Sequence, residues 1–172
     1  MAKGYVQLYT GDGKGKTTAA LGLALRSAGH KQRVFIGQFM KGQHYGELSA
    51  LTHIDEIDIE QFGDAGCIRR EEVTDLHRQH AERGIRRIEE ILLSGGYRMV
   101  IMDEIAVTVW FGIVDLERVL GVLQKRPDGV ELILTGRRAP ERLIEAADLV
   151  TEMHEIKHYY RDGIPAREGI EF

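Results

Sequence analysis

The chain has little cysteine, little proline and no long hydrophobic run, and these shortages exclude several classes of protein. Its 172 residues include one cysteine and three prolines. A single Cys67 cannot form an internal disulfide, so a reducing cytoplasm is the expected compartment. The apolar runs fall short of the ~20 residues of a membrane-spanning helix, and no charged-then-apolar signal segment opens the chain. We therefore expect a cytoplasmic protein with no membrane partner.

Positive charge is also limited, while glycine is abundant. The 23 Lys and Arg against 27 Asp and Glu leave a net charge of −4, which argues against a protein that wraps nucleic acid. The length and the 43% hydrophobic content predict one globular domain over residues 1–172. The 20 glycines are spread between apolar segments with no Gly/Ser-rich tract, which indicates joints in a folded domain and not a linker.

Short apolar segments alternate with helical patterns along the chain. Several of the strand-like segments are apolar without a break, as expected for parallel strands covered on both faces. The alternation predicts an α/β fold, with a mostly parallel sheet and helices on both faces. The predicted strands are 5–9, 33–39, 57–62, 99–102, 130–134, 149–153 and 156–160, and the predicted helices are 19–29, 73–93, 116–123 and one beginning at Pro140.

A glycine-rich loop lies between the first predicted strand and the first predicted helix. Glycines let backbone N–H groups converge on phosphate oxygens, and the helix N-terminus favours their negative charge. Lys16 adds a point charge, and the Thr17 hydroxyl can ligate Mg²⁺. Thr10 stands where the pattern G-x-x-x-x-G-K-[ST] has its first glycine, and the alternative is a glycine-rich turn with a surface lysine. The residues expected to bind the nucleotide are Gly11, Asp12, Gly13, Lys14, Gly15, Lys16, Thr17 and Thr18.

Charged residues after two later strands complete a predicted nucleotide site. Asp103 and Glu104 follow an apolar strand, at the edge where open α/β sheets bind ligands, and are candidates for holding Mg²⁺. Arg137 follows another strand, and its planar fork suits terminal phosphate oxygens. Arg26, on the first helix, is a further candidate. The alternative for both arginines is a solvated side chain.

The histidines and the cysteine do not form a recognisable site. His77 and His80 are three residues apart on one predicted helix, but no third ligand stands at a telling spacing, so we predict a solvated helix face and no zinc site. Cys67 has no activating partner nearby in the sequence. We expect none of the three to carry chemistry.

The phosphate loop by itself indicates a nucleotide and not a reaction. A GTPase would need a segment of the N-K-x-D kind, which is missing. A nucleic-acid motor would show basic stripes, whereas the net charge here is −4. A small-molecule kinase would usually carry an arginine-rich lid, but the best candidate for one, residues 69–72, has equal numbers of basic and acidic side chains. From the residues alone, an ATPase or kinase with Glu104 as base stays open, and so does a regulatory module that binds ATP without turnover.

Essentially the whole chain resembles the P-loop ATP:corrinoid adenosyltransferases, including Thr10 at the start of the loop. The shared segments are TGDGKGKTTAALGLALR with Gly29-His30, QFMKG at 38–42, Asp103-Glu104, Arg126-Pro127, ILTGR with Ala139-Pro140, ADLVTEM at 147–153, Lys157-His158, Gly163, Ala166 and Gly169-Ile170-Glu171. The resemblance implies a RecA-like P-loop fold, ATP as co-substrate with Mg²⁺, and a homodimer. It also implies a corrinoid substrate (cobalamin, cobinamide or cobyrinic acid a,c-diamide), with a flavoprotein as the source of the electron.

The resemblance further implies that Co(I) attacks the 5′ carbon of ATP and that triphosphate leaves. No protein nucleophile is then needed, which agrees with the lack of a Ser/His or Cys/His constellation. The protein must orient ATP and stabilise the leaving charge, and we take Lys16, Thr17 and Glu104 as the catalytic candidates. The chain departs from the family at Gly66-Cys67-Ile68-Arg69, where many members have an aromatic G-F-x-W stretch. Phe62 can supply part of a hydrophobic wedge, while Trp110 and Phe111 are candidates for a corrinoid face, a dimer contact or the core.

Overall fold

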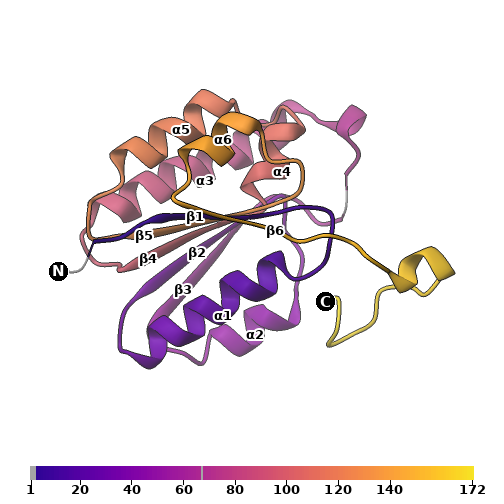
Figure 1. The fold of residues 1–172 in the computed structure, drawn as a ribbon, viewed down its shortest axis with the longest axis horizontal. Coiled ribbons are helices and arrows are strands. Elements are labelled where there is room, and N and C mark those ends of the chain that lie inside the picture. The colour runs from indigo at the N-terminus through magenta and orange to yellow at the C-terminus, as the bar shows by residue number, and fades with distance from the viewer. Residues whose placement is uncertain (1–2, 67) are drawn as a thin grey trace.

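The computed structural model describes residues 3–66 and 68–172 and has three layers, with a sheet between two layers of helices (Figure 1). The strands are β1 (Val6–Thr10), β2 (Val34–Phe39), β3 (Ile57–Phe62), β4 (Met99–Asp103), β5 (Glu131–Thr135) and β6 (Leu149–Glu152). The helices are α1 (Lys16–Gly29), α2 (Gly46–Leu51), α3 (Asp75–Leu93), α4 (Ile105–Trp110), α5 (Leu116–Lys125) and α6 (Glu141–Ala146), with short 3₁₀ turns at Arg70–Glu72 and Tyr159–Asp162.

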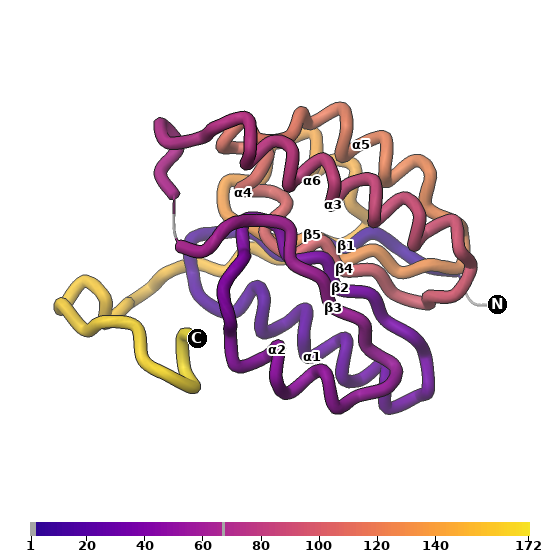
Figure 2. Tube along the Cα trace, turned by 180° about the vertical axis from the view of Figure 1, so that it is seen from behind, coloured from indigo at the N-terminus to yellow at the C-terminus, as the bar shows by residue number. Residues whose placement is uncertain are grey.

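The sheet has six strands in the order β3-β2-β4-β5-β1-β6, and every neighbouring pair is parallel. Helices α1 and α2 cover one face, while α3, α4, α5 and α6 lie on the other (Figures 1 and 2). This confirms the predicted α/β fold. Because all the strands run in the same direction, the segments that follow β1, β2, β4 and β5 emerge at one edge of the sheet, which is where ligands bind in open α/β sheets.

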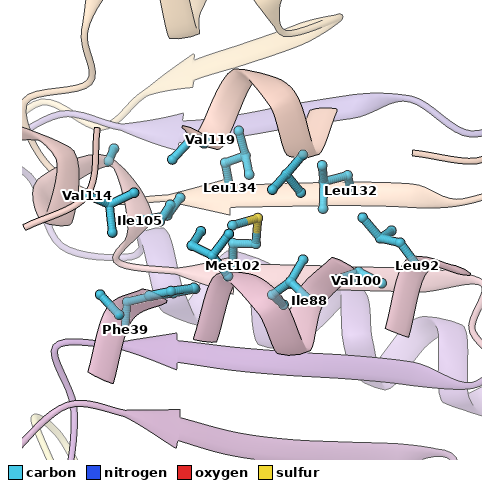
Figure 3. Packing of buried hydrophobic residues seen from close by; sticks show 14 of the residues in the cluster. Phe39, Ile88, Leu92, Val100, Met102, Ile105, Val114, Val119, Leu132 and Leu134 are labelled. Atoms are coloured by element: carbon cyan, nitrogen blue, oxygen red, sulfur yellow. The ribbon is translucent and has the colours of Figure 1, made fainter. Parts of the chain in front are cut away.

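Two apolar cores lie on the two faces of the sheet, and β4 shows how its sequence supplies both. Val100 and Met102 belong to the core under α3 and α5, whereas Met99 and Ile101 belong to the core under α1. Successive side chains of a strand point to opposite faces, so an unbroken apolar strand fills two cores at once. Figure 3 shows the larger core, in which Ile88 of α3 packs over the strands.

The structure corrects the sequence reading in three places. Residues 156–160 were predicted as a strand, but 156–158 are irregular, Tyr159 and Tyr160 begin the 3₁₀ turn, and Ile156 is 97% exposed. Among the described residues, the segment pairs with no strand of the sheet. Two short helices, α2 and α4, were not predicted, because six residues give too little periodicity to recognise. The long helix begins at Asp75 and not at residue 73.

Candidate functional site

The phosphate loop leaves β1 at Thr10 and enters α1 at Lys16. Gly11 and Gly15 have φ angles of 94° and 114°, in the left-handed region that favours glycine. A Cβ on Gly13 would lie 2.7 Å from the carbonyl oxygen of Met153, so this glycine also lets the C-terminal segment approach the loop. The loop therefore opens onto the N-terminus of a fourteen-residue helix, where backbone N–H groups and the helix dipole attract anions.

The Lys16 side chain is folded into this loop. It is 6% exposed, and its Nζ donates a hydrogen bond of 2.6 Å to the carbonyl oxygen of Gly13. Burial lowers the pKa of Lys16 from its ordinary value, while the nearby Glu104 carboxylate favours the charged form. A cation held this way is available to phosphate oxygens, which can take the place of the Gly13 carbonyl.

Asp103, at the end of β4, collects hydrogen bonds from three other segments. It is 1% exposed. Its Oδ1 accepts from the Thr17 hydroxyl at 2.9 Å and from the Thr135 hydroxyl at 2.7 Å. Its Oδ2 accepts from Lys41 Nζ at 2.9 Å and from Gln38 Nε2 at 3.4 Å. The carboxylate thus joins α1, β2 with its following loop, and β5 at the edge of the sheet.

Lys41 is a site residue that the sequence reading did not single out as functional. Its side chain is 14% exposed and forms ion pairs with Asp103 and, at 3.7 Å, with Glu47 of α2. Burial opposes the charge, but the Asp103 carboxylate outweighs burial, and the pKa of Lys41 is raised. The sequence signals were its position, two residues beyond the end of a buried strand, and its place in the shared segment QFMKG.

Glu104 follows Asp103 in a left-handed conformation, with φ of 63°. Its N–H donates to the Thr135 hydroxyl at 2.8 Å, and its carbonyl accepts from Thr108, which anchors the turn. Burial raises the pKa of Glu104, and the adjacent Asp103 carboxylate raises it further. A carboxyl group placed this way would gain most from a neighbouring cation.

Oxygen donors suited to Mg²⁺ are present beside the loop. The Thr17 hydroxyl and the Asp103 carboxylate are within hydrogen-bond distance, and Glu104 is the next residue. Mg²⁺ in phosphate sites is commonly bound by one or two carboxylates together with phosphate oxygens and water. Within residues 3–66 and 68–172 no group of three or more His, Cys, Asp or Glu residues could hold a metal by itself. The residues therefore fit a Mg²⁺ that arrives with the nucleotide.

The two predicted arginines lie in different places. Arg137 is exposed after β5, and its charge is near enough to lower the pKa of both Lys16 and Glu104. Gly136 turns the chain here with φ of 135°. Arg26 lies in the last turn of α1, ten residues beyond Lys16, which is about 15 Å at the helical rise. The structure does not bring Arg26 to the loop.

The remaining loop residues point outward. Asp12 is exposed and pairs with Arg138 at 3.7 Å, and Thr18 is exposed on the first turn of α1. Lys14 Nζ contacts Glu171 Oε1 at 2.6 Å and the Tyr159 hydroxyl at 3.0 Å. Lys14, predicted to bind phosphate, is thus engaged by the C-terminal segment.

A second group of residues lies beyond β2 and β3. Met40, Phe62 and Ile68 line a small cavity of about 20 Å³ there. Asp64 lies 3.5 Å from His77 and 3.2 Å from His80. His77 Nδ1 also accepts from the N–H of Thr74, so this histidine caps α3.

The aromatic pair at the end of α4 is divided between surface and core. Trp110 is 41% exposed, with the Arg70 guanidinium 5.1 Å from its ring centre. Phe111 is partly buried against the larger core. Cys67, in the predicted loop between β3 and α3, lies outside the described residues.

Comparison with known proteins identifies relatives over the full length. The family described as ATP:corrinoid adenosyltransferase BtuR/CobO/CobP matches residues 2–172. A corrinoid adenosyltransferase of Sinorhizobium sp is 36% identical over 173 residues, covering 99% of this chain and 81% of that protein. One of Pseudomonas aeruginosa is 33% identical over 174 residues, covering 99% and 84%. One of Escherichia coli K12 is 35% identical over 176 residues, covering 99% and 86%.

Proposed function

The chain belongs to the ATP:corrinoid adenosyltransferase family, and we propose that the site around Lys16 and Asp103 performs the family's reaction. The enzyme is a transferase that forms an adenosylcorrinoid from ATP. In the step we propose, the electron pair of Co(I) forms a bond to the 5′ carbon of ATP. The bond from that carbon to its phosphate oxygen breaks, and triphosphate leaves with the bonding pair.

The observation that carries the proposal is the buried Lys16 in the phosphate loop, near the buried Asp103 carboxylate that accepts hydrogen bonds from several segments. The leaving triphosphate gains negative charge in the transition state, so groups that stabilise it there accelerate the reaction. Lys16 and the backbone N–H groups at the start of α1 are suited to this task. The cobalt centre is itself the nucleophile, so the protein's work is to orient ATP and to stabilise the leaving group.

We assign Mg²⁺ to Thr17 and Asp103, with Glu104 beside them. When bound, the ion would neutralise charge on the phosphate oxygens. Burial and the Asp103 carboxylate raise the pKa of Glu104, and a cation bound beside it would favour its charged form. Arg137 reaches the same space from β5 and is assigned to the phosphate oxygens. Arg26 is left out of the proposed site because of its distance along α1.

The corrinoid would approach the edge of the sheet where the strands end. Trp110, exposed beside Arg70, offers a flat surface near that edge. The substrates we propose are cobalamin, cobinamide or cobyrinic acid a,c-diamide, with a flavoprotein supplying the electron and a homodimer as the assembly. No helix in the described residues is long and apolar enough to span a membrane. The single Cys67 and the need for Co(I) both suit a reducing cytoplasm, where we place the reaction.

The test is anaerobic incubation with ATP, Mg²⁺ and chemically generated Co(I) corrinoid, followed by visible absorbance and chromatography of the phosphates. We expect adenosylcorrinoid and triphosphate in equal amounts. Lys16→Ala should lower the rate by about a hundredfold or more, from lost stabilisation of the leaving group, while Lys31→Ala at the other end of α1 should leave it unchanged. ADP and phosphate at a comparable rate would instead indicate an ATPase or kinase.

A further inference from the structure

The C-terminal segment, residues 153–172, lies against the phosphate loop and continues past it. Met153 continues the pairing of β6, because its N–H donates to Thr10 at 2.9 Å and its carbonyl accepts from Gly13 at 2.7 Å. The chain then leaves the sheet, makes the 3₁₀ turn and returns, so that its end lies toward α1 and α2 (Figures 1 and 2). A Cβ on Gly46, at the start of α2, would lie 3.9 Å from the Phe172 carbonyl. We call residues 153–172 the C-terminal strap.

One carboxylate fastens the strap to the loop. Glu171 contacts Lys14 at 2.6 Å, and it also accepts a hydrogen bond from the Tyr159 hydroxyl. The N–H of Arg167 donates to the same carboxylate at 2.8 Å, and its guanidinium lies 4.8 Å from the centre of the Tyr159 ring. The pKa of Glu171 is lowered by the hydrogen bonds from Lys14 and Tyr159. The contact between Lys14 and Glu171 joins residues that are 157 positions apart in the sequence.

The strap and the loop line a cavity between them that is open to solvent. Its volume is about 370 Å³, and it is lined by Gly13 and Lys14 of the loop and by residues 154–159 of the strap. That is within the range of roughly 300–1,000 Å³ found for small-molecule sites.

The charges of the lining favour an anion. Glu155, the acidic side chain of this lining, pairs with Arg161. Lys157 is exposed and forms no ion pair with any residue in the described part of the chain. Two imidazole rings, those of His154 and His158, complete the polar lining. A cavity that continues from a phosphate loop and offers a free ammonium group matches a polyphosphate better than a nucleobase.

We propose that the C-terminal strap closes the phosphate end of the nucleotide site, with Glu171 as the positioning residue that fastens it and Lys157 as the cation it presents to the triphosphate. This inference rests on the proposed function, because it takes ATP at the phosphate loop as given. Glu171 acts through Lys14 and Tyr159 and does not touch the nucleotide itself.

The test compares binding of Mg²⁺-ATP and of Mg²⁺-tripolyphosphate to the full-length protein by titration calorimetry. Glu171→Gln should weaken both ligands by about three- to tenfold, the scale of a partly exposed charged contact. Lys157→Ala should weaken both by a similar factor. In the Glu171→Gln background, Lys157→Ala should have little further effect, because the free strap no longer presents this lysine. Glu168→Gln is the matched control and should bind as wild type, since Glu168 forms no ion pair within the described residues.

Several outcomes would overturn the inference. Equal affinities in Glu171→Gln and Glu168→Gln would show that the strap does not matter for binding. Weaker ATP binding with unchanged tripolyphosphate binding would mean that the cavity takes the nucleoside and not the phosphates. Additive effects of Glu171→Gln and Lys157→Ala would show that the two residues act independently, and that Glu171 does not position Lys157.

Two further measurements test the position of the strap without relying on ligand binding. Trypsin cleavage at Lys157 and Arg161 should be faster in Glu171→Gln than in Glu168→Gln, while the thermal unfolding midpoints stay alike. Wild-type protein that binds neither ligand would count against the proposed function itself, before the strap is considered.

Discussion

Replacing Lys41 should reveal how strongly the buried Lys41–Asp103 pair holds the site together. The two charged atoms are 2.9 Å apart, and the side chains are 14% and 1% exposed. At an effective dielectric constant of about 20, the attraction is about 6 kcal/mol, and roughly half is offset by removing both groups from water. Thr17 and Thr135 still donate to Asp103 after the change. We therefore expect Lys41→Met to lower the free energy of unfolding by about 3 kcal/mol.

A double-mutant cycle measured by urea unfolding tests this value. Asp103→Asn alone should cost a similar amount, because it leaves the buried Lys41 charge with the Glu47 carboxylate, at 3.7 Å, as its remaining ion pair. The double variant should cost about 3 kcal/mol and not the sum of about 6, which gives a coupling energy near 3 kcal/mol. With a slope of about 2 kcal/mol per molar urea, each single variant should unfold about 1.5 M earlier.

The matched control is Lys31→Met. Lys31 pairs with Glu56 at 2.8 Å, nearly the same distance, but its side chain is 83% exposed. An exposed pair is screened by solvent, so this variant should unfold close to wild type. If Lys41→Met were as stable as Lys31→Met, or if the two site substitutions were additive, the Lys41–Asp103 pair would not hold the site together.

Two further predictions concern Arg137 and Glu89. Arg137→Ala should raise the KM for ATP about tenfold with a smaller change in kcat, because it removes a phosphate contact. The control is Arg142→Ala on α6. An effect confined to corrinoid binding would show that Arg137 does not contact the phosphates. Glu89 of α3 is held by Arg118 and Lys125 of α5, and the hydrogen bonds from Arg118 lower its pKa to about 2. After allowance for solvent screening, Glu89→Gln should lower the free energy of unfolding by about 1–2 kcal/mol at pH 7. A carboxyl group whose pKa is lowered by folding stabilises the fold at pH values above its pKa in the unfolded chain, near 4.5. The difference in free energy of unfolding between wild type and Glu89→Gln should therefore shrink as the pH drops from 4.5 toward 2. A difference that is unchanged at pH 2 would refute this prediction.

Much of the fold was readable because its signals are local. β4 is a run of apolar residues that ends in an acid, and its burial on both faces follows from that pattern. The strap was misread for the opposite reason. Residues 156–160 contain the apolar and aromatic types found in strands, but a strand forms only where it can pair with a neighbouring strand, and here Tyr159 and Glu171 contact Lys14 instead.

The candidate site likewise contains residues that a local motif identifies and residues that only the tertiary structure brings to the site. Gly11 to Thr18 were recognisable as a unit because the motif is eight consecutive residues, the loop and the first turn of α1. Lys41 and Glu171 lie in segments shared with the family, but nothing in those segments assigns either residue a role. Their roles depend on which strands lie side by side, and the sheet order β2-β4-β5-β1 is a property of the whole chain.

The sequence alone therefore determined the alternation of strands and helices, the phosphate loop and the acidic strand end, since these depend on neighbouring residues. Only the tertiary structure decided which groups meet. Thr17 and Asp103 are 86 positions apart, and Lys14 and Glu171 are 157 apart. Parallel strands bring their C-terminal ends to one edge, and that convergence makes a site out of residues that no local pattern connects.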